Sequence, residues 1–443
     1  MKNVLVNRKL GKIPPAWDQS VIFFANILSL FFGNNVGTDV LRKKVGVLES
    51  YGSRLIPIIN LLFHGKNNLL ILEKEPAHEL LKYFQIDLKL DLPEFKIISH
   101  DQFKNISHEK SLINFLIKHP ASDIDGYVTD EILEKLAECV HKKTVSSAGG
   151  GRKGNNKFLL HQYLRSKYLP LFDTCIAEKV TDVESCLNKL KSKGYTQAVI
   201  KAQIGASGIG MEKIKLDGSI VNIPNYLFYE GSCLVQGWLD DTVTGVRYIS
   251  SPSVQLMIKD DSVHLYDVTE QILSQDSVHQ GNISPSVYLN NNKDIQKELL
   301  DQAQIASQWL FDQGYRGTAS VDFHLCERND KVEVRICEIN ARVTGATYPS
   351  VLARYFYSKG AWLMRNIRFT PPTEGRRILD ELRGNDLLFY PGKTYGVLPF
   401  NFNVNDKGYV VKGQFLYLGE NLEDIKRLVN NVVESIQGDY DRD

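Results

Sequence analysis

Hydrophobic and polar positions alternate along this chain in a pattern that predicts a mixed α/β protein. Up to about residue 115, short apolar runs and a helical pattern follow one another, which predicts an α/β domain with a small parallel sheet. The apolar runs are 2–7, 54–60, 67–74 and 95–99, and the helical pattern is 78–85. A longer apolar run, VIFFANILSLFF at 21–32, is shorter than the about 20 residues that span a bilayer. We therefore expect a buried helix or a strand–helix segment there.

A glycine-rich stretch, TVSSAGGGRKGNNK at 144–157, separates this region from the rest of the chain. The helical pattern at 127–143 ends just before it. Glycines and serines among polar neighbours predict a loop, either a domain boundary or a mobile flap. Two helical patterns follow at 157–168 and 182–194, and then a strong apolar strand at 197–203.

The second half of the chain is richer in strands. Turns and strands dominate to about residue 290, and a helix at 297–314 precedes two strands at 317–325 and 332–340. Proline and glycine become more frequent after 370, and a small set of strands then ends in a helix at 423–436. This order of elements predicts two or three domains, as the length of 443 residues also does.

Composition narrows the functional classes. The chain is 43% hydrophobic and 24% charged, which is typical of a soluble globular protein. A net charge of +1 provides no general attraction to nucleic acid or to a membrane, so we expect neither as a partner. The six cysteines lack metal-ligand spacing, which favours free thiols in a reducing compartment. Because the sequence also lacks a signal-peptide pattern, we expect a cytoplasmic protein.

The first stretch with candidate chemistry is VIKAQIGASGIGMEKI at 199–214. A strand that contains Lys201 leads into a glycine-rich turn and then into a second strand-like run. Glycines allow backbone N–H groups to approach an anion, and a lysine adds a point charge for phosphate. A plain hairpin that needs glycines for its turn explains the stretch equally well. The candidate phosphate-binding residues of the turn are Gly205, Ser207, Gly208 and Gly210.

The second stretch is the pair of strands at 317–325 and 332–340. Asp322 lies on the first strand, Glu338 and Asn340 lie on the second, and a turn-like CERNDKVE segment lies between them. Antiparallel pairing would bring these three oxygen-bearing side chains together, and such a set suits Mg²⁺. Arg342 could neutralise charge that develops beside the metal. The alternatives are an exposed two-stranded ribbon and an ordinary surface arginine.

A third stretch, CLVQGWLDD at 233–241, lies between the other two. An apolar strand leads into Gln236, Trp238 and Leu239, whose backbone could read the edge of a purine base. Asp241 is the candidate for ribose hydroxyls. An ordinary strand end would have the same sequence.

Taken in order, these motifs resemble the ATP-grasp superfamily over about residues 150–370. The most specific elements are ASVDFHL, VRICEINAR and IKAQIGASGIGM. The resemblance implies that Lys157 and Lys201 bind the nucleotide, that 205–210 closes over its phosphates, and that Arg342 stabilises the reacting group together with Lys201. It also implies one or two Mg²⁺ ions, or Mn²⁺, on Asp322, Glu338 and Asn340. Gln236 departs from the family, which usually has an acid at this position.

The whole chain is similar to ATP-grasp ligases with a pre-ATP-grasp N-terminal domain, the group that includes the pheganomycin-type peptide ligase. The segments that carry this similarity are VTEQIL at 268–273, HQGNISPS at 279–286 and EINARVTGATYPS at 338–350. The similarity implies an α/β (α+β) fold. It also makes Glu270 and His279 candidate substrate contacts, although both could be ordinary loop residues. The implied domains are a pre-ATP-grasp domain at 1–145, an ATP-grasp domain at 146–370 with lobes at about 157–240 and 241–370, and a C-terminal subdomain at 371–443.

The reaction implied by the resemblance joins a carboxylate to an amine. MgATP phosphorylates the carboxylate to an acyl phosphate, and an amine then displaces phosphate to form an amide or peptide bond. The expected partners are a small carboxylate and an amino acid or peptide, and a homodimer is the default assembly. A small-molecule kinase of the same fold and a non-catalytic ATP-binding protein are the alternatives. The sequence does not specify which acid and which amine are joined.

Overall fold

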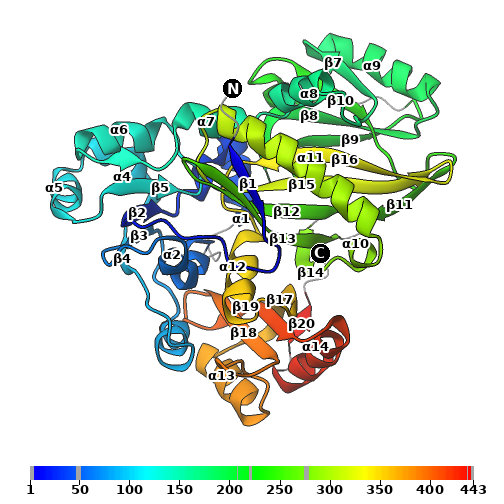
Figure 1. The fold of residues 1–443 in the computed structure, drawn as a ribbon. Helices are drawn as coiled ribbons and strands as arrows, with labels where there is room; N and C mark the ends of the chain where they lie inside the picture. Colours follow the sequence, from blue (N-terminus) through cyan, green and yellow to red (C-terminus); the bar gives the residue numbers. More distant parts are fainter. Residues whose placement is uncertain are drawn as a thin grey trace.

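The strands of the part of the chain that the structure describes form three β-sheets, which occupy different parts of the molecule (Figure 1). The computed structural model describes residues 4–45, 51–206, 208–218, 222–273, 279–436 and 438–440. The sheets have five, four and eleven strands, and helices lie against all of them. This arrangement confirms the predicted α/β class. Within the described residues, no helix is both long enough and apolar enough to cross a membrane.

The five-stranded sheet belongs to the N-terminal region and is parallel throughout, as predicted. Every residue of its two central apolar strands is buried, because helices cover both faces of a parallel sheet. In spatial order the strands are β4 (Glu94–Ile97), β3 (Leu69–Leu72), β2 (Val21–Phe24), β5 (Asp123–Gly126) and β6 (Lys143–Thr144). The helices of this region are η1 (Ile27–Phe31), α1 (Asn35–Val45), η2 (Tyr51–Leu55), α2 (Ile56–Leu62), α3 (His78–Lys82), η3 (Tyr83–Asp87), α4 (His100–Lys104), η4 (Ile106–His108), α5 (Lys110–Lys118) and α6 (Glu131–Cys139).

Two apolar runs assigned to this sheet lie elsewhere. The run at 2–7 forms β1 (Leu5–Arg8), which pairs in parallel with β13 of the eleven-stranded sheet. The run at 54–60 is helical rather than extended, with Pro57 in the first turn of α2. Proline is tolerated there because the first helical N–H groups have no partner in the helix. The error at 54–60 arises because a short, buried apolar run has the same pattern in a strand and in a helix. The run at 2–7 is a strand as predicted, but its pattern does not specify which sheet it joins.

The glycine-rich stretch at 144–157 is not a loop. Residues Ala148–Gly154 form a helix, α7, whose first turn is capped by the Ser147 hydroxyl. A Cβ at Gly150 would lie 2.7 Å from the carbonyl carbon of Gly314. A Cβ at Gly154 would lie 2.4 Å from Leu310. These glycines let the helix approach its neighbours closely, so the prediction of a mobile flap is wrong.

Alanine substitutions within α7 test this explanation. Gly150→Ala is expected to lower the free energy of unfolding by about 1–3 kcal/mol, because the new methyl group meets backbone atoms that cannot move away cheaply. Gly149 is the matched control, because it is exposed in the same turn and a Cβ there meets nothing within 4 Å. Gly149→Ala is expected to stabilise by about 0.5–1 kcal/mol through helix propensity. Urea unfolding measures both, and equal effects would contradict the packing explanation.

The four-stranded sheet forms a separate lobe (Figure 1, upper right). Its strand order is β7 (Thr174–Ala177), β10 (Cys233–Gly237), β8 (Gln197–Ala206) and β9 (Ile209–Lys215). Helices α8 (Lys157–Ser166) and α9 (Val180–Ser192) and the short η5 (Asn225–Phe228) accompany it. The two helices and the strand–turn–strand unit predicted for this region are therefore present. The unit is an antiparallel hairpin of β8 and β9.

The eleven-stranded sheet forms the centre and the C-terminal part of the molecule (Figure 1). Helices α10 (Val287–Asn291) and α11 (Lys293–Asp312) pack on one of its faces. The main strand order is β11 (Val246–Ser250), β15 (Gly317–Arg328), β12 (Pro252–Ile258), β13 (Ser262–Leu273), β14 (His279–Ser284), β17 (Ala361–Thr373), β19 (Val410–Gly419) and β18 (Gly396–Val404). Strands β1, β16 (Lys331–Asn340) and β20 (Asp439–Tyr440) pair beside it, and α12 (Thr347–Phe356), α13 (Gly375–Gly384) and α14 (Leu422–Ile436) complete this part.

The strands after residue 370 extend the central sheet instead of forming a sheet of their own. Strand β17 runs through the predicted boundary at 370, and β19 and β18 add to its edge. The domain boundaries at 145 and 370 stay predictions.

Candidate active site

Strands β15 and β16 form the antiparallel hairpin that the sequence predicts, and their register brings the three candidate metal ligands together. Asp322 pairs with Glu338, and Ser320 pairs with Asn340. The Asn340 amide nitrogen donates to Asp322 Oδ2 at 2.8 Å and lies 3.5 Å from Glu338 Oε1. Two carboxylates and one amide therefore share one face near one end of the large sheet.

The oxygen atoms of this group fit a hard divalent cation. Asn340 is buried, and its Oδ1 atom is a buried acceptor without a hydrogen-bond partner among the described residues. With the carboxylates of Asp322 and Glu338 it would offer three oxygen donors, and Mg²⁺ takes the rest of its shell from water and phosphate. The described residues contain no cluster of three His, Cys, Asp or Glu side chains placed to hold a metal. The amide oxygen is therefore an essential part of the candidate ligand set.

The two carboxylates have opposite electrostatic surroundings. Burial and the neighbouring Glu338 charge raise the pKa of Asp322. Burial acts in the same direction on Glu338, but Lys157 and Arg342 outweigh it and lower the pKa of that carboxyl. Lys157 and Arg342 therefore keep Glu338 in its anionic form. Any further positive charge at the site would stabilise the anionic form of Asp322.

Both predicted nucleotide lysines lie beside this face. Lys157 is the first residue of α8, and its Nζ is 2.8 Å from Glu338 Oε2 and 3.4 Å from the Gly205 carbonyl oxygen. Lys201 is on β8, and burial lowers its pKa although the Glu338 charge opposes this effect. The lysines therefore connect the glycine hairpin to the carboxylates.

Arg342 completes the cluster and is held by a residue that the sequence analysis did not select. Its Nη1 donates to Asn155 Oδ1 at 2.6 Å. The same Oδ1 accepts from the Ala341 backbone N–H at 3.2 Å, and Asn155 Nδ2 donates to the Ala341 carbonyl at 3.1 Å. Asn155 follows α7 directly. The close packing of the glycine helix therefore places the side chain that orients Arg342, and no local sequence signal reveals this contact.

A chain of neutral polar side chains lies behind Asp322. Ser253 Oγ donates to Asp322 Oδ1 at 2.6 Å, Gln255 Nε2 donates to Ser253 Oγ at 2.8 Å, and Thr344 Oγ1 donates to Gln255 Oε1 at 3.4 Å. Ser253 and Gln255 lie on β12, which pairs with β15. The alternation in SPSVQ at 251–255 is the only sequence signal for this support, and it does not identify the partner strand.

The glycine hairpin packs against the N-terminal region. Its residues Ile204, Ala206 and Ile209 share an apolar cluster with Phe31 and Phe32 of the N-terminal part. Gly208 lies in the turn, while Ser207 lies outside the described residues. A Cβ at Gly205 would lie 2.6 Å from the Ile209 carbonyl oxygen, so the hairpin itself requires this glycine. The plain-hairpin explanation of the glycines therefore stays open.

The candidate base-reading strand is present as β10, but the carboxylate of Asp241, which follows it, hydrogen-bonds to a nearby backbone group. Buried Gln236 donates through Nε2 to Thr174 Oγ1 at 3.0 Å. Trp238 lies 4.1 Å from the Lys213 ammonium group, and Leu239 is buried. Asp241 Oδ1 accepts from the Tyr248 backbone N–H at 2.6 Å. Leu239 shares an apolar cluster with Cys326 of β15, whereas the predicted ribose acid Asp241 is engaged by the Tyr248 backbone.

Glu270, one of the two substrate candidates, does not share the face of Asp322, Glu338 and Asn340. Glu270 lies on the opposite face of β13 from Thr269, which pairs with Ser253, and it accepts a 2.6 Å hydrogen bond from Ser286 at the start of α10. The His279 backbone pairs with Leu273, and the placement of its side chain lies outside the description. On β13 and β14, alternation instead turns Thr269, Gln271, Asn282 and Ser284 toward the Asp322 face.

A histidine lies two residues beyond Asp322 on the same face of β15. His324 packs against Phe172 and Tyr248, with ring centroids 5.7 and 5.5 Å away. Burial, assisted by nearby Arg335 and Lys201, lowers its pKa to about 4. The ring is therefore neutral at physiological pH. No spacing in the sequence distinguishes His324 from the other residues of ASVDFHL.

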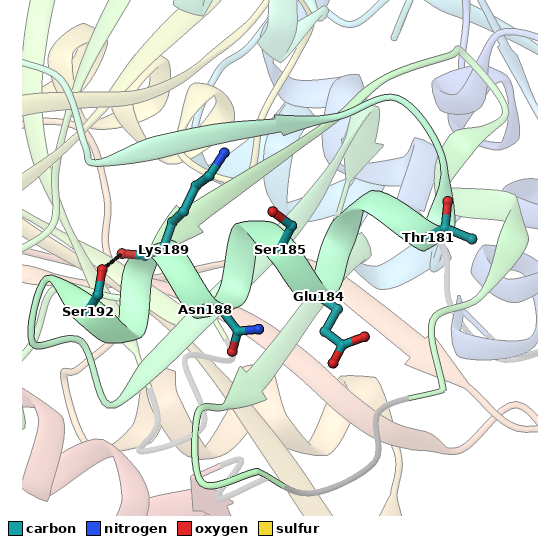
Figure 2. Close-up of a pocket in the computed structure, with 6 residues that line it drawn as sticks. All are labelled: Thr181, Glu184, Ser185, Asn188, Lys189 and Ser192. Carbon is teal, nitrogen blue, oxygen red and sulfur yellow. Dashed lines mark hydrogen bonds between the residues drawn. The ribbon is translucent and has the colours of Figure 1, made fainter.

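A hollow on the outside of the four-stranded lobe is unrelated to this cluster. It lies along one face of α9 and is lined only by polar side chains, as Figure 2 shows. None of the candidate residues above contributes to it. The lining residues are Thr181, Glu184, Ser185, Asn188, Lys189 and Ser192. We assign no function to this surface.

No family model matches the chain. It is 27% identical over 251 residues to the [butirosin acyl-carrier protein]–L-glutamate ligase of Niallia circulans, and the match covers 54% of this chain and 57% of that protein. The chain thus spans about half the length of this curated relative.

Solved structures resemble the whole chain. A biotin carboxylase from Campylobacter jejuni, in complex with a β-γ-ATP ligand, has a TM-score of 0.59 at 11% identity and covers 96% of this chain and 92% of its own. The N5-carboxyaminoimidazole synthase of Aspergillus clavatus, with ADP and its ribonucleotide, has a TM-score of 0.56 at 13% identity and covers 95% and 99%. At these identities the likeness concerns the fold.

Proposed function

We propose that this chain, which has the ATP-grasp fold, is an ATP-dependent ligase that joins a carboxylate to an amine. The observation that carries the proposal is the single cluster of Asp322, Glu338 and Asn340 with Arg342, Lys157 and Lys201. Anion-binding cations surround an oxygen donor set for Mg²⁺, and the glycine hairpin lies beside both. The partial match to a carrier-protein–glutamate ligase supports the same reaction class.

The proposed chemistry proceeds in two displacements. An oxygen of the substrate carboxylate attacks the γ-phosphorus of ATP, the bond to the β-phosphate oxygen breaks, and ADP leaves. The amine then attacks the acyl carbon, the carbon–oxygen bond to phosphate breaks, and the amine loses a proton as the amide forms. Bound Mg²⁺ would supply charge neutralisation on the phosphate oxygens.

The residues of this chain position the reactants and neutralise charge. Lys157 and Lys201 are placed to bind phosphate oxygens, and Arg342 is placed to stabilise the charged acyl-phosphate or tetrahedral species. The hairpin, packed against the N-terminal region, excludes water that would hydrolyse the intermediate. No nucleophilic side chain is required.

The test is an assay of ADP and phosphate release over a panel of amino acids, short peptides and an acyl-carrier protein with L-glutamate, with mass spectrometry of the product. A carboxylate labelled with ¹⁸O is expected to transfer one labelled oxygen to the released phosphate. Amide product without such transfer would exclude the acyl phosphate. A phosphorylated product without free phosphate would identify a kinase, and binding of ATP without turnover for any candidate would favour a non-catalytic role.

The packing of the hairpin against the N-terminal region gives a further prediction. Ile209→Ser removes buried apolar surface from the cluster with Phe31 and Phe32, so the closed arrangement loses stability. We expect turnover to fall by about tenfold and less amide to form per ADP released, because the open hairpin admits water. Product and ADP are quantified in the same reaction.

Ile176→Ser is the matched control, because Ile176 is an exposed isoleucine of β7 in the same lobe. It is expected to leave turnover and the ratio of amide to ADP unchanged. If both variants behave alike, the contact with the N-terminal region has no part in closure.

A further inference from the structure

Asp125 is a buried carboxylate on β5, in the parallel sheet of the N-terminal region. Its Oδ1 atom accepts from the Gly126 backbone N–H at 2.8 Å and lies 3.5 Å from Thr129 Oγ1. Burial raises the pKa of Asp125 to about 7, and among the described residues no positive charge offsets this effect. Buried carboxylates are normally paired with a cation, so this side chain indicates a cationic ligand.

A gap at Gly317, the first residue of β15, borders this carboxylate. A Cβ at Gly317 would lie 3.4 Å from the Tyr315 hydroxyl oxygen and 3.9 Å from Asp125 Oδ2, so a methyl group would fit there without a clash. The φ angle of Gly317 is +112°, which side chains rarely adopt. The conformation therefore keeps open a methyl-sized space that two oxygen atoms border.

Both of these oxygen atoms can accept a hydrogen bond from a ligand. Tyr315 donates its hydroxyl proton to the Thr318 carbonyl oxygen, which leaves the lone pairs of its hydroxyl oxygen as acceptors. Asp125 Oδ2 is an acceptor whenever the carboxylate is ionised. An ammonium group carries a positive charge and donates through three N–H groups without accepting. It is also about the size of a methyl group, whereas a guanidinium is larger, so an ammonium group matches the gap.

The gap lies at the same end of the β15–β16 hairpin as Arg342. Ser320, three residues after the start of β15, pairs with Asn340, and Arg342 lies two residues beyond Asn340. Burial raises the pKa of Tyr315, Asp125 adds to this effect, and the nearby Arg342 opposes it. Tyr315 is therefore within electrostatic reach of both groups. An ammonium at the gap would lie near the guanidinium that is proposed to stabilise the acyl phosphate.

We propose that Asp125 Oδ2 and the Tyr315 hydroxyl oxygen bind the ammonium group of the amine substrate. This inference rests on the proposed function, since it identifies the nucleophile as a primary amine that arrives protonated, as the α-amine of an amino acid does. One N–H bond then breaks and an O–H bond forms on the Asp125 carboxylate. The electron pair left on nitrogen attacks the acyl carbon, and a second proton passes to the departing phosphate as the amide forms.

Saturation-transfer NMR of methylammonium tests the site without any ligase substrate, on the full chain with MgADP at pH 8. Asp125→Asn and Tyr315→Phe each remove one of the two acceptors. Asp123→Asn is the matched control, because Asp123 lies two residues earlier on β5 and hydrogen-bonds to Ser122. Tetramethylammonium, which has no N–H group, is the control probe.

We expect methylammonium to bind the unaltered protein and Asp123→Asn, and to bind Asp125→Asn and Tyr315→Phe about tenfold more weakly. Tetramethylammonium should not bind. Asp125→Asn should melt no earlier than the unaltered protein, because asparagine keeps the acceptor for the Gly126 N–H and removes a buried, unpaired charge. Absence of methylammonium binding by the unaltered protein, or equal binding by Asp125→Asn, overturns the inference and leaves the proposed function intact.

A second measurement compares two nucleophiles, with the carboxylate that the ADP-release panel selects. Hydroxylamine is uncharged at pH 8, so it attacks an acyl phosphate without needing an ammonium site. Asp125→Asn should slow amide formation about tenfold more than hydroxamate formation. Equal losses with both nucleophiles overturn the inference. Absence of ADP release with every acid overturns the proposed function, and methylammonium binding then decides whether the ammonium site itself stands.

Discussion

Glu338→Gln is expected to reduce substrate-dependent ADP release by about a thousandfold or more. The carboxylate is the anion that Lys157 contacts at 2.8 Å, and it faces Asp322 across the hairpin. Glutamine keeps the shape and the oxygen but removes the charge, so the metal affinity and the phosphate alignment are both lost. The measurement is coupled ADP release over a range of Mg²⁺ concentrations, because weakened metal binding also shifts the Mg²⁺ requirement upward.

Glu327→Gln is the matched control on the other end of the same hairpin. Glu327 pairs with Arg247 on β11, at a partly exposed position away from the cluster. Surface ion pairs contribute little to the free energy of unfolding. ADP release by Glu327→Gln should therefore stay within about twofold of that of the unaltered protein. Circular dichroism and the melting temperature of both variants separate loss of chemistry from loss of folding. Full ADP release by a folded Glu338→Gln protein would remove Glu338 from the proposed site.

The sequence predicted that Asp322, Glu338 and Asn340 lie together because all the determinants of this arrangement are local. Asp322, Glu338 and Asn340 belong to two consecutive strands joined by a short turn. Alternation decides which side chains share a face, and the turn decides the pairing. Neither step needs knowledge of distant residues. The same reasoning holds for the β8–β9 hairpin, whose glycines mark the turn.

Long-range packing limited the rest of the prediction. Strand β5 has the sequence DIDG, and all four of its residues are buried in the parallel sheet. Because this sequence is not an apolar run, the hydrophobic pattern did not predict the strand. The glycines of α7 favoured a loop prediction because the residues against which they pack, Gly314 and Leu310, are distant in the sequence. Asn155 and Ser253 contact the site from other elements. The contacts of Asn155 and Ser253 depend on which elements pack together, and the neighbouring sequence does not determine this packing.

Asn155 gives the sharpest test of how the fold serves the proposed reaction, through its hydrogen bond to Arg342. Arg342→Lys keeps a positive charge but loses the planar guanidinium group that donates to Asn155. We expect kcat to fall by about a hundredfold to a thousandfold, with the Kd for ATP changed little. A parallel loss of ATP affinity would instead make Arg342 a nucleotide-binding residue.

Asn155→Ala leaves the guanidinium in place without its acceptor, so we expect a smaller fall in kcat, about tenfold. If Asn155 acts by orienting Arg342, adding Asn155→Ala to the Arg342→Lys protein should cost little more, because the interaction is already lost. A structural role through the Ala341 backbone would multiply the two losses instead. Melting temperatures of all three variants exclude unfolding as the cause. Non-additive losses in kcat therefore connect the glycine-packed helix α7 to the chemistry at β16, and additive losses separate them.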